Sequence, residues 1–243
     1  MKKNRFDTAL VTGASSGIGR ALAIELSRNS TFIYLTGRNQ KELTNTAKLL
    51  DCESSISVAD LSTKNGVEKI SKIIEEENLD LLINNAGFGS GGYFHERTLE
   101  KEISLIDTNV DAVVKLTHTY INKLINTDKK GSILNVGSVV SFFPRPSNVT
   151  YAASKAFVRS FSNALHAKYK DKGIFVSCLY PGLTYTNFFG NPESMRKYKF
   201  VGQEPEHVAK IAIKGLCKNK RRIVPGFINY LIIFIGKYLY KYY

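Results

Sequence analysis

The sequence predicts a three-layer α/β fold, in which helices cover both faces of a doubly wound parallel sheet of about seven strands. Three observations support this fold class. Short apolar runs alternate with amphipathic stretches along the whole chain, a pattern typical of βαβ units. A glycine-rich segment follows directly after the first apolar run. No proline- or glycine-rich linker and no fixed-period repeat divides the 243 residues, so the pattern indicates a single domain over residues 1–243.

The expected strands are short and apolar, and the segments between them carry apolar residues at helical spacing. Two segments depart from the alternation: Leu183–Gln203, which is irregular and rich in aromatic and basic residues, and the tail 226–243. The first interrupts the last strand–helix unit, where α/β folds often place a substrate-covering loop. The predicted strands are Thr8–Thr12, Thr31–Thr36, Ser55–Ala59, Leu79–Asn84, Gly131–Gly137, Ile174–Tyr180 and Arg222–Pro225.

The composition excludes several classes of protein. Hydrophobic residues make up 43% of the chain and charged residues 23%, which favours an ordinary folded domain over a disordered chain or a membrane-embedded bundle. The three cysteines form no C-x-x-C pair and the four histidines lack ligand spacing, so neither a disulfide framework nor a metal site is expected. The basic start Met1–Arg5 is followed by Asp7 and by no apolar run of signal-peptide length, so we expect a cytoplasmic protein.

A glycine-rich turn joins the first predicted strand to a helix, with the sequence Thr12-Gly13-Ala14-Ser15-Ser16-Gly17-Ile18-Gly19. Glycine lets the turn tighten and lets backbone approach a pyrophosphate, while the helix N-terminus supplies free N–H donors. The same letters match the G-x-S-x-G nucleophile elbow of α/β-hydrolases, with Ser15 as nucleophile and His166 or His207 as its base. An elbow on the first strand, however, has no earlier strand–helix loop to complete an oxyanion hole. A P-loop is excluded because Arg20 and Ala21 follow the last glycine.

A tyrosine and a lysine four residues apart, Tyr151 and Lys155, share one face of a predicted helix. A free tyrosine has a pKa near about 10 and is a poor proton shuttle at neutral pH, but a neighbouring ammonium group favours the phenolate. Ser138 ends a predicted strand, at the edge of the sheet where doubly wound folds place their ligands. Its hydroxyl is suited to hold a substrate oxygen while Tyr151 donates or removes a proton.

Together these segments resemble the short-chain dehydrogenase/reductase family. Thr12–Gly19 is similar to the family's TGxxxGxG motif, and Asn84–Gly87 to its NNAG motif. The spacing of Ser138, Tyr151 and Lys155 resembles its Ser and YxxxK arrangement, and the match runs in the correct order from residue 8 to about residue 190. The resemblance implies a Rossmann-like domain that transfers a hydride between a nicotinamide cofactor and a carbonyl or alcohol group.

The resemblance also assigns a role to each matching residue. Tyr151 becomes the general acid/base, Ser138 polarises the substrate carbonyl, and Lys155 binds the nicotinamide ribose and lowers the pKa of Tyr151. Asn109 becomes the fourth catalytic member, which holds a water between the lysine and solvent. Asp60 becomes an adenine contact. The predicted cofactor-binding residues are Gly13, Ser15, Ser16, Gly17, Ile18, Gly19, Arg38, Asp60, Leu61, Asn85, Ala86, Gly87, Tyr151, Lys155, Pro181, Gly182, Thr184 and Thr186.

The end of the second predicted strand favours NADP(H) over NAD(H). In NAD-preferring Rossmann folds a carboxylate at this place accepts hydrogen bonds from the adenosine ribose. Here Gly37 and Arg38 follow the strand, and a guanidinium group binds phosphate through two parallel charge-assisted hydrogen bonds. Arg38 therefore favours a cofactor with a 2′-phosphate, with Ser15 as a second contact, and reduction of the substrate is the expected direction. The alternative is a non-catalytic NADP-binding redox sensor, which would need the glycine-rich turn but none of the three catalytic side chains.

The remaining expectations concern substrate and partners. We expect a small-molecule substrate, a homodimer or homotetramer, and no nucleic-acid partner. An apolar substrate, with an acidic end, suits the aromatic and basic residues of the 183–203 loop, and packing of the loop onto the domain is the alternative reading. These residues are Phe188, Phe189, Arg196, Lys197, Tyr198, Lys199 and Phe200.

The tail combines apolar sequence with positive charge. The net charge of the chain is +13, and residues 195–243 contribute +9 of it, with 11 Lys and Arg against only Glu204 and Glu206. Ile223–Gly236 runs for 14 residues without a charge, which is too short to span a bilayer. Three uses of the tail stay open at this point: packing over the substrate pocket, forming a subunit interface, or making a weak peripheral membrane contact.

Overall fold

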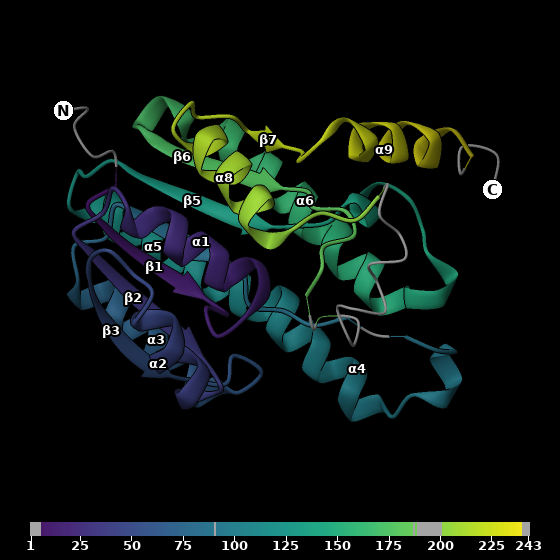
Figure 1. The fold of residues 1–243 in the computed structure, drawn as a ribbon, viewed down its shortest axis with the longest axis horizontal. Coiled ribbons are helices and arrows are strands. Elements are labelled where there is room, and N and C mark those ends of the chain that lie inside the picture. The colour runs from purple at the N-terminus through teal and green to yellow at the C-terminus, as the bar shows by residue number, and fades with distance from the viewer. Residues whose placement is uncertain (1–5, 90, 187, 189–200, 240–243) are drawn as a thin grey trace.

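The computed structural model describes residues 6–89, 91–186, 188 and 201–239. Its centre is a seven-stranded sheet in the order β3-β2-β1-β4-β5-β6-β7, with every neighbouring pair of strands parallel (Figure 1). This architecture confirms the predicted fold class. The strands are β1 Thr8–Thr12, β2 Phe32–Gly37, β3 Glu53–Val58, β4 Leu81–Asn84, β5 Gly131–Val136, β6 Ile174–Leu179 and β7 Arg222–Ile223.

Helices cover both faces of this sheet (Figure 1). The α-helices in the described part of the chain are α1 Gly17–Ser27, α2 Gln40–Ala47, α3 Lys64–Glu76, α4 Leu99–Ile106, α5 Ala112–Asn126, α6 Val149–Tyr169, α8 Pro205–Leu216 and α9 Phe227–Leu239. The buried residues of α1 and α8 belong to one apolar cluster, and those of α3 and α5 belong to another. Successive residues of β1 alternate between them, because Ala9 and Val11 pack in the first cluster and Leu10 in the second. The sheet is therefore buried on both sides.

All seven predicted strands form at their predicted places, although several ends differ. β7 is two residues long because Pro225 has no N–H to donate to a ladder and Gly226, with a φ of 74°, turns the chain away. β3 begins earlier than predicted because its ladder with β2 already pairs Glu53 with Phe32.

The strand order creates a crevice at one edge of the sheet. The chain runs outward from β1 to β3 and then crosses back to β4, on the other side of β1. In such sheets ligands bind beyond the carboxyl ends of the strands beside this reversal. Thr12 and Asn84, the last residues of β1 and β4, mark that place.

The two ends of the predicted 183–203 loop lie side by side. The Gln203 N–H donates to the Leu183 carbonyl at 2.9 Å, and the Tyr185 N–H donates to the Gln203 carbonyl at 3.0 Å. Phe188 is described and lies in the cleft treated below. The other aromatic and basic residues predicted to act in this loop lie outside the described residues: Phe189, Arg196, Lys197, Tyr198, Lys199 and Phe200.

Candidate active site

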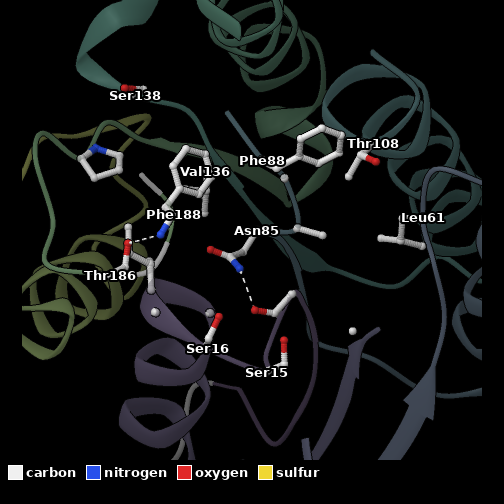
Figure 2. A pocket seen from close by; sticks show the side chains of 18 of the residues that line it. Ser15, Ser16, Leu61, Asn85, Phe88, Thr108, Val136, Ser138, Thr186 and Phe188 are labelled. Atoms are coloured by element: carbon white, nitrogen blue, oxygen red, sulfur yellow. Dashed lines mark hydrogen bonds between the residues drawn. The ribbon is translucent and has the colours of Figure 1, made fainter. Parts of the chain in front are cut away.

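A cleft of about 330 Å³ lies at this carboxyl edge of the sheet (Figure 2). It brings together every residue that the sequence predicted to contact the cofactor, from Gly13 to Thr186, and Ser138 lines it as well. Asn109 does not line the cleft and is fully buried. Each lining residue that the sequence analysis missed stands within two positions of a predicted site residue. This proximity in the sequence is the signal that could have identified them. The missed residues are Thr36, Gly37, Ala59, Phe88, Thr108, Val136 and Gly137.

The turn from β1 into α1 requires glycine at three positions. Gly13 and Gly17 have φ values of 65° and 54°, in the left-handed region that other residues seldom adopt. Gly19 has no room for a side chain, because a Cβ there would lie 2.2 Å from the Gly13 carbonyl oxygen and 2.3 Å from Asn85 Nδ2. Ser16 is the N-cap residue of α1, so the first N–H groups of this helix lack intrahelical acceptors at the cleft. The turn can therefore bind an anionic group with backbone donors and the helix dipole.

Thr12 connects β1 to the segment after β4. Its buried hydroxyl accepts hydrogen bonds from the backbone N–H groups of Asn85 and Ala86, both at 2.9 Å, and donates to the Ile83 carbonyl at 3.2 Å. The Asn85 side chain donates in return to the carbonyl oxygens of Thr12 and Gly13, at 2.9 and 3.2 Å. Figure 2 shows Asn85 at the centre of the cleft, above Ser15 and Ser16. Sequence analysis did not assign this organising role to Thr12.

The end of β2 presents a free guanidinium group to the cleft. Arg38 is exposed and lines the cleft, and among the residues that the structure describes it has neither an ion pair nor a hydrogen bond. The Ser15 hydroxyl lies close by, since a Cβ on Gly37 would be 3.2 Å from Ser15 Oγ. The neighbouring Arg20 is already engaged, because it pairs with Glu42 at 2.6 Å and donates to the Ser15 carbonyl at 2.5 Å. Arg38 is thus the cation available to a ligand here.

Asp60 and Leu61 form the wall of the cleft beyond β3. The Asp60 carboxylate accepts hydrogen bonds from the backbone N–H and the hydroxyl of Ser62, at 3.0 and 2.8 Å. The Asp60 carbonyl lies so close to α3 that a Cβ on Gly66 would be 1.9 Å from it. These contacts hold Asp60 in a fixed orientation beside the cleft.

Ser138, Tyr151 and Lys155 meet in the same cleft. Tyr151 and Lys155 project from α6, Ser138 follows β5, and all three are buried. The Tyr151 and Ser138 side chains interact, and the Lys155 amine lies 5.8 Å from the centroid of the Tyr151 ring. Lys155 Nζ also donates to the Val136 carbonyl at 2.8 Å, which holds it at the end of β5.

Burial controls the ionisation of two of these side chains. It raises the pKa of Tyr151 to about 12, although the hydrogen bond with Ser138 and the positive charge of Arg145 act in the opposite direction. It lowers the pKa of Lys155 to about 8. In the protein by itself, the loss of phenolate hydration outweighs the neighbouring positive charge. The expectation that Lys155 lowers the pKa of Tyr151 beside a cationic nicotinamide stays a prediction.

Asn109 lies in a single π-helical turn, Asp107–Asp111, between α4 and α5. Such turns are frequent at functional sites. Its Oδ1 accepts a hydrogen bond from the Phe88 N–H, and its Nδ2 donates to the Phe88 carbonyl and to Ser154 Oγ, at 3.1, 3.1 and 3.2 Å. Asn109 therefore joins the segment after β4 to α6, one residue before Lys155. These three hydrogen bonds fix the orientation of the Asn109 side chain.

Two phenylalanines border the cleft. The ring centroids of Phe188 and Tyr151 are 5.6 Å apart, and Phe88 lies on the other side of the cleft (Figure 2). Their rings offer an apolar surface to a ligand, the usual lining of small-molecule sites.

The hydrolase alternative finds no support in this geometry. Ser15 lines the cleft, but no histidine does so among the described residues. Instead, His166 Nδ1 hydrogen-bonds to the Val176 carbonyl at 2.8 Å, within β6. Within the described ranges there is also no group of three or more His, Cys, Asp or Glu side chains that could hold a metal ion.

Comparison with known proteins identifies the family. The short chain dehydrogenase family matches residues 7–197, so the chain belongs to this family of oxidoreductases, as the sequence motifs predicted. An uncharacterized short-chain type dehydrogenase/reductase of Sinorhizobium fredii is 34% identical over 218 residues, which cover 86% of this chain and 84% of the relative.

Two solved structures show the same fold. A short-chain dehydrogenase from Sphingobium yanoikuyae in complex with NADPH is 27% identical with a TM-score of 0.82, over 90% of this chain and 88% of that one. The bulky-bulky ketone specific alcohol dehydrogenase from Comamonas testosteroni is 27% identical with a TM-score of 0.81, over 92% of this chain and 87% of that one.

Proposed function

We propose that this protein is an NADP(H)-dependent carbonyl reductase that uses Ser138, Tyr151 and Lys155, with Asn109 as a positioning residue. The observation that carries the proposal is the meeting of the three catalytic side chains in the cleft that also holds the glycine-rich turn and Arg38. The cleft fits a dinucleotide, because the turn leaves no space for side chains at Gly19 and presents backbone donors to a pyrophosphate.

The proposed reaction is the reduction of a carbonyl group to an alcohol. When bound, the reduced nicotinamide supplies the hydride to the carbonyl carbon. The Ser138 hydroxyl donates a hydrogen bond to the carbonyl oxygen, and Tyr151 transfers its phenolic proton to that oxygen as negative charge develops. Lys155 holds the nicotinamide ribose, and its charge favours the phenolate that remains. Proton transfer of this kind contributes about 10²–10⁴-fold to the rate.

The ionisation states suit this direction of reaction. With a pKa of about 12, Tyr151 is fully protonated at neutral pH and is ready to donate. The reverse reaction needs a phenolate, which the positive charge of an oxidised nicotinamide beside Lys155 would favour. We therefore expect the pKa of Tyr151 to fall when NADP⁺ is bound.

NADP(H) is proposed over NAD(H) because of the end of β2. No carboxylate stands there to accept hydrogen bonds from the ribose, and the unpaired guanidinium of Arg38 can bind a 2′-phosphate together with the Ser15 hydroxyl. Arg20 cannot replace Arg38 without losing its ion pair with Glu42.

The proposed substrate is an apolar ketone or aldehyde. Phe88 and Phe188 border the cleft beside Tyr151, and the similar enzyme from Comamonas testosteroni is specific for bulky ketones. A homodimer or homotetramer is also proposed, supported by exposed apolar residues on α4 and α6: Ile103, Ile106 and Phe157.

The test is NADPH oxidation with a series of ketones of graded size, comparing the wild type with Tyr151→Phe. This variant keeps the ring and its packing on Phe188 but lacks the transferable proton, so turnover should fall by about 10²–10⁴-fold while NADPH affinity changes little. Near-normal turnover in Tyr151→Phe would overturn the proposed acid. If the wild type binds NADPH but turns over no carbonyl compound, the redox-sensor alternative is favoured instead.

A further inference from the structure

Helix α9 is held against the domain by its inner face. Asn229 is fully buried, and its side-chain amide donates to the Pro225 carbonyl at 2.6 Å and to Gln203 Oε1 at 3.1 Å. Gly236 packs so closely that a Cβ there would lie 2.2 Å from the ring of Phe143. These contacts fix the rotation of the helix about its axis and therefore determine which residues face outward.

The outer face of α9 is apolar. Figure 1 shows the helix running outward from β7 along one edge of the molecule, next to the C-terminus. Phe227 is 81% exposed and Phe234 69% exposed, which is unusual for aromatic side chains in one patch. Within the described part of the chain no helix is long and apolar enough to cross a membrane. The outer face consists of Phe227, Tyr230, Leu231, Phe234, Ile235, Tyr238 and Leu239.

Three cations surround a single ring beside this face. Arg222 from β7, Arg159 from α6 and Lys237 from α9 lie 4.5, 4.9 and 5.0 Å from the centroid of Phe142. The pKa of Lys237 is lowered by burial and by repulsion from Arg222 and Arg159, which shows that the positive charges act on one another. We call these three residues the Phe142 cation cluster.

Among the residues that the structure describes, the cluster has no anionic partner. Among the described residues none of the three cations forms an ion pair or a hydrogen bond, and the buried Nε atoms of Arg159 and Arg222 are without an acceptor. The sequence that includes α9 adds no negative charge, since no acidic residue lies between Glu206 and Tyr243. Buried guanidinium nitrogens normally have an acceptor, so the cluster is suited to a ligand with negatively charged oxygens.

We propose that the outer face of α9 and the Phe142 cation cluster together dock onto an anionic phospholipid surface. The apolar face enters the boundary between headgroups and acyl chains, and the cations bind lipid phosphate at its edge. A second copy of this chain fits less well, because a two-fold contact through the same patch would bring two unpaired cation clusters towards each other. The surface is separate from the cofactor cleft, since none of its residues lines that cleft.

The experiment is co-sedimentation of the full chain with phosphatidylcholine vesicles, with and without phosphatidylserine. Binding should require phosphatidylserine and should fall at high salt. Lys237→Gln should weaken it about fivefold, as expected for one cation near an anionic surface. Phe234→Gln should weaken binding about tenfold or more, because the variant has no aromatic ring at this position to transfer from water into the lipid. Circular dichroism checks the fold of each variant.

Matched controls lie at the opposite edge of the sheet. Lys41→Gln on α2 removes the same charge, and Leu49→Gln after α2 removes an apolar side chain that is 56% exposed. Both should bind vesicles like the wild type. Equal losses in Lys41→Gln and Lys237→Gln would overturn the proposal, because binding would then follow net charge alone.

Two other outcomes would also overturn it. The first is no vesicle binding together with thermal stabilisation by inorganic phosphate that Lys237→Gln abolishes, which would make the cluster a site for small free anions. The second is no vesicle binding together with a dimer in analytical ultracentrifugation that Phe234→Gln dissociates, which would make α9 a subunit interface.

Discussion

Removal of the Thr12 hydroxyl should destabilise the whole cleft, because one oxygen atom holds two segments together. In Thr12→Val the side chain keeps nearly the same shape, but the N–H groups of Asn85 and Ala86 lose their acceptor and the Ile83 carbonyl loses a donor. Each buried polar group left unsatisfied costs about 1–3 kcal/mol. Water from the cleft can reach the two partly buried N–H groups, so the low end applies to each, and the expected loss is about 2–4 kcal/mol.

Thermal unfolding of the cofactor-free protein, followed by circular dichroism, measures this loss. For a domain of this size the Tm should fall by about 4–16 °C. Thr12→Ser is the matched control, because it keeps the hydroxyl and loses a single methyl group, worth about 1 kcal/mol. If Thr12→Val is as stable as Thr12→Ser, the hydroxyl does not organise the cleft and the reasoning fails.

Three further substitutions test other parts of the site. Arg38→Ala should weaken NADPH binding by about 1.5–3 kcal/mol and leave NADH binding nearly unchanged, as measured by fluorescence titration; equal losses would contradict the 2′-phosphate contact. The pKa of Lys155 is about 8 in the folded protein against 10.5 in the unfolded chain. As the pH rises, Lys155 therefore loses its proton in the folded protein before it does so in the unfolded chain. In urea unfolding, the free energy of unfolding of the wild type should therefore rise relative to that of Lys155→Met between these pH values, by on the order of 3 kcal/mol. A difference between the two proteins that does not change with pH would refute the lowered pKa of Lys155. Gly182→Ala would place a Cβ 2.0 Å from Asn229 Oδ1 and should cost about 1–3 kcal/mol, and adding Asn229→Ala should recover part of that loss if this clash is the cause.

The fold could be predicted because its signals are local. β1 shows this well: its apolar residues alternate between two cores, so the strand reads as a continuous apolar run that ends at the glycine turn. Strand ends were less predictable, because they depend on pairing with a neighbour distant in sequence. Glu53 joins β3 only because Phe32 lies opposite it.

The position of the site could also be predicted, but its energetics could not. The motif spacing placed Tyr151 and Lys155 on one face of a helix, and the structure brings them to the cleft together with Ser138. Their pKa values depend on burial by surrounding elements, which spacing does not reveal, so the rise in the pKa of Tyr151 on burial could not be predicted from the sequence. The availability of Arg38 likewise depends on Glu42 engaging Arg20, a contact between two helices.

The proposed docking surface and the predicted substrate loop are connected through Gln203. This residue closes the 183–203 loop by backbone hydrogen bonds with Leu183 and Tyr185, and its side chain accepts a hydrogen bond from Asn229 on α9. Asn229 also packs on Gly182, which lines the cofactor cleft. If α9 lies on a phospholipid surface, these contacts keep Gly182 and the cofactor cleft at a fixed distance from that surface. Apolar carbonyl compounds partition into lipid, so docking would bring the enzyme to the place where the proposed class of substrate is most concentrated.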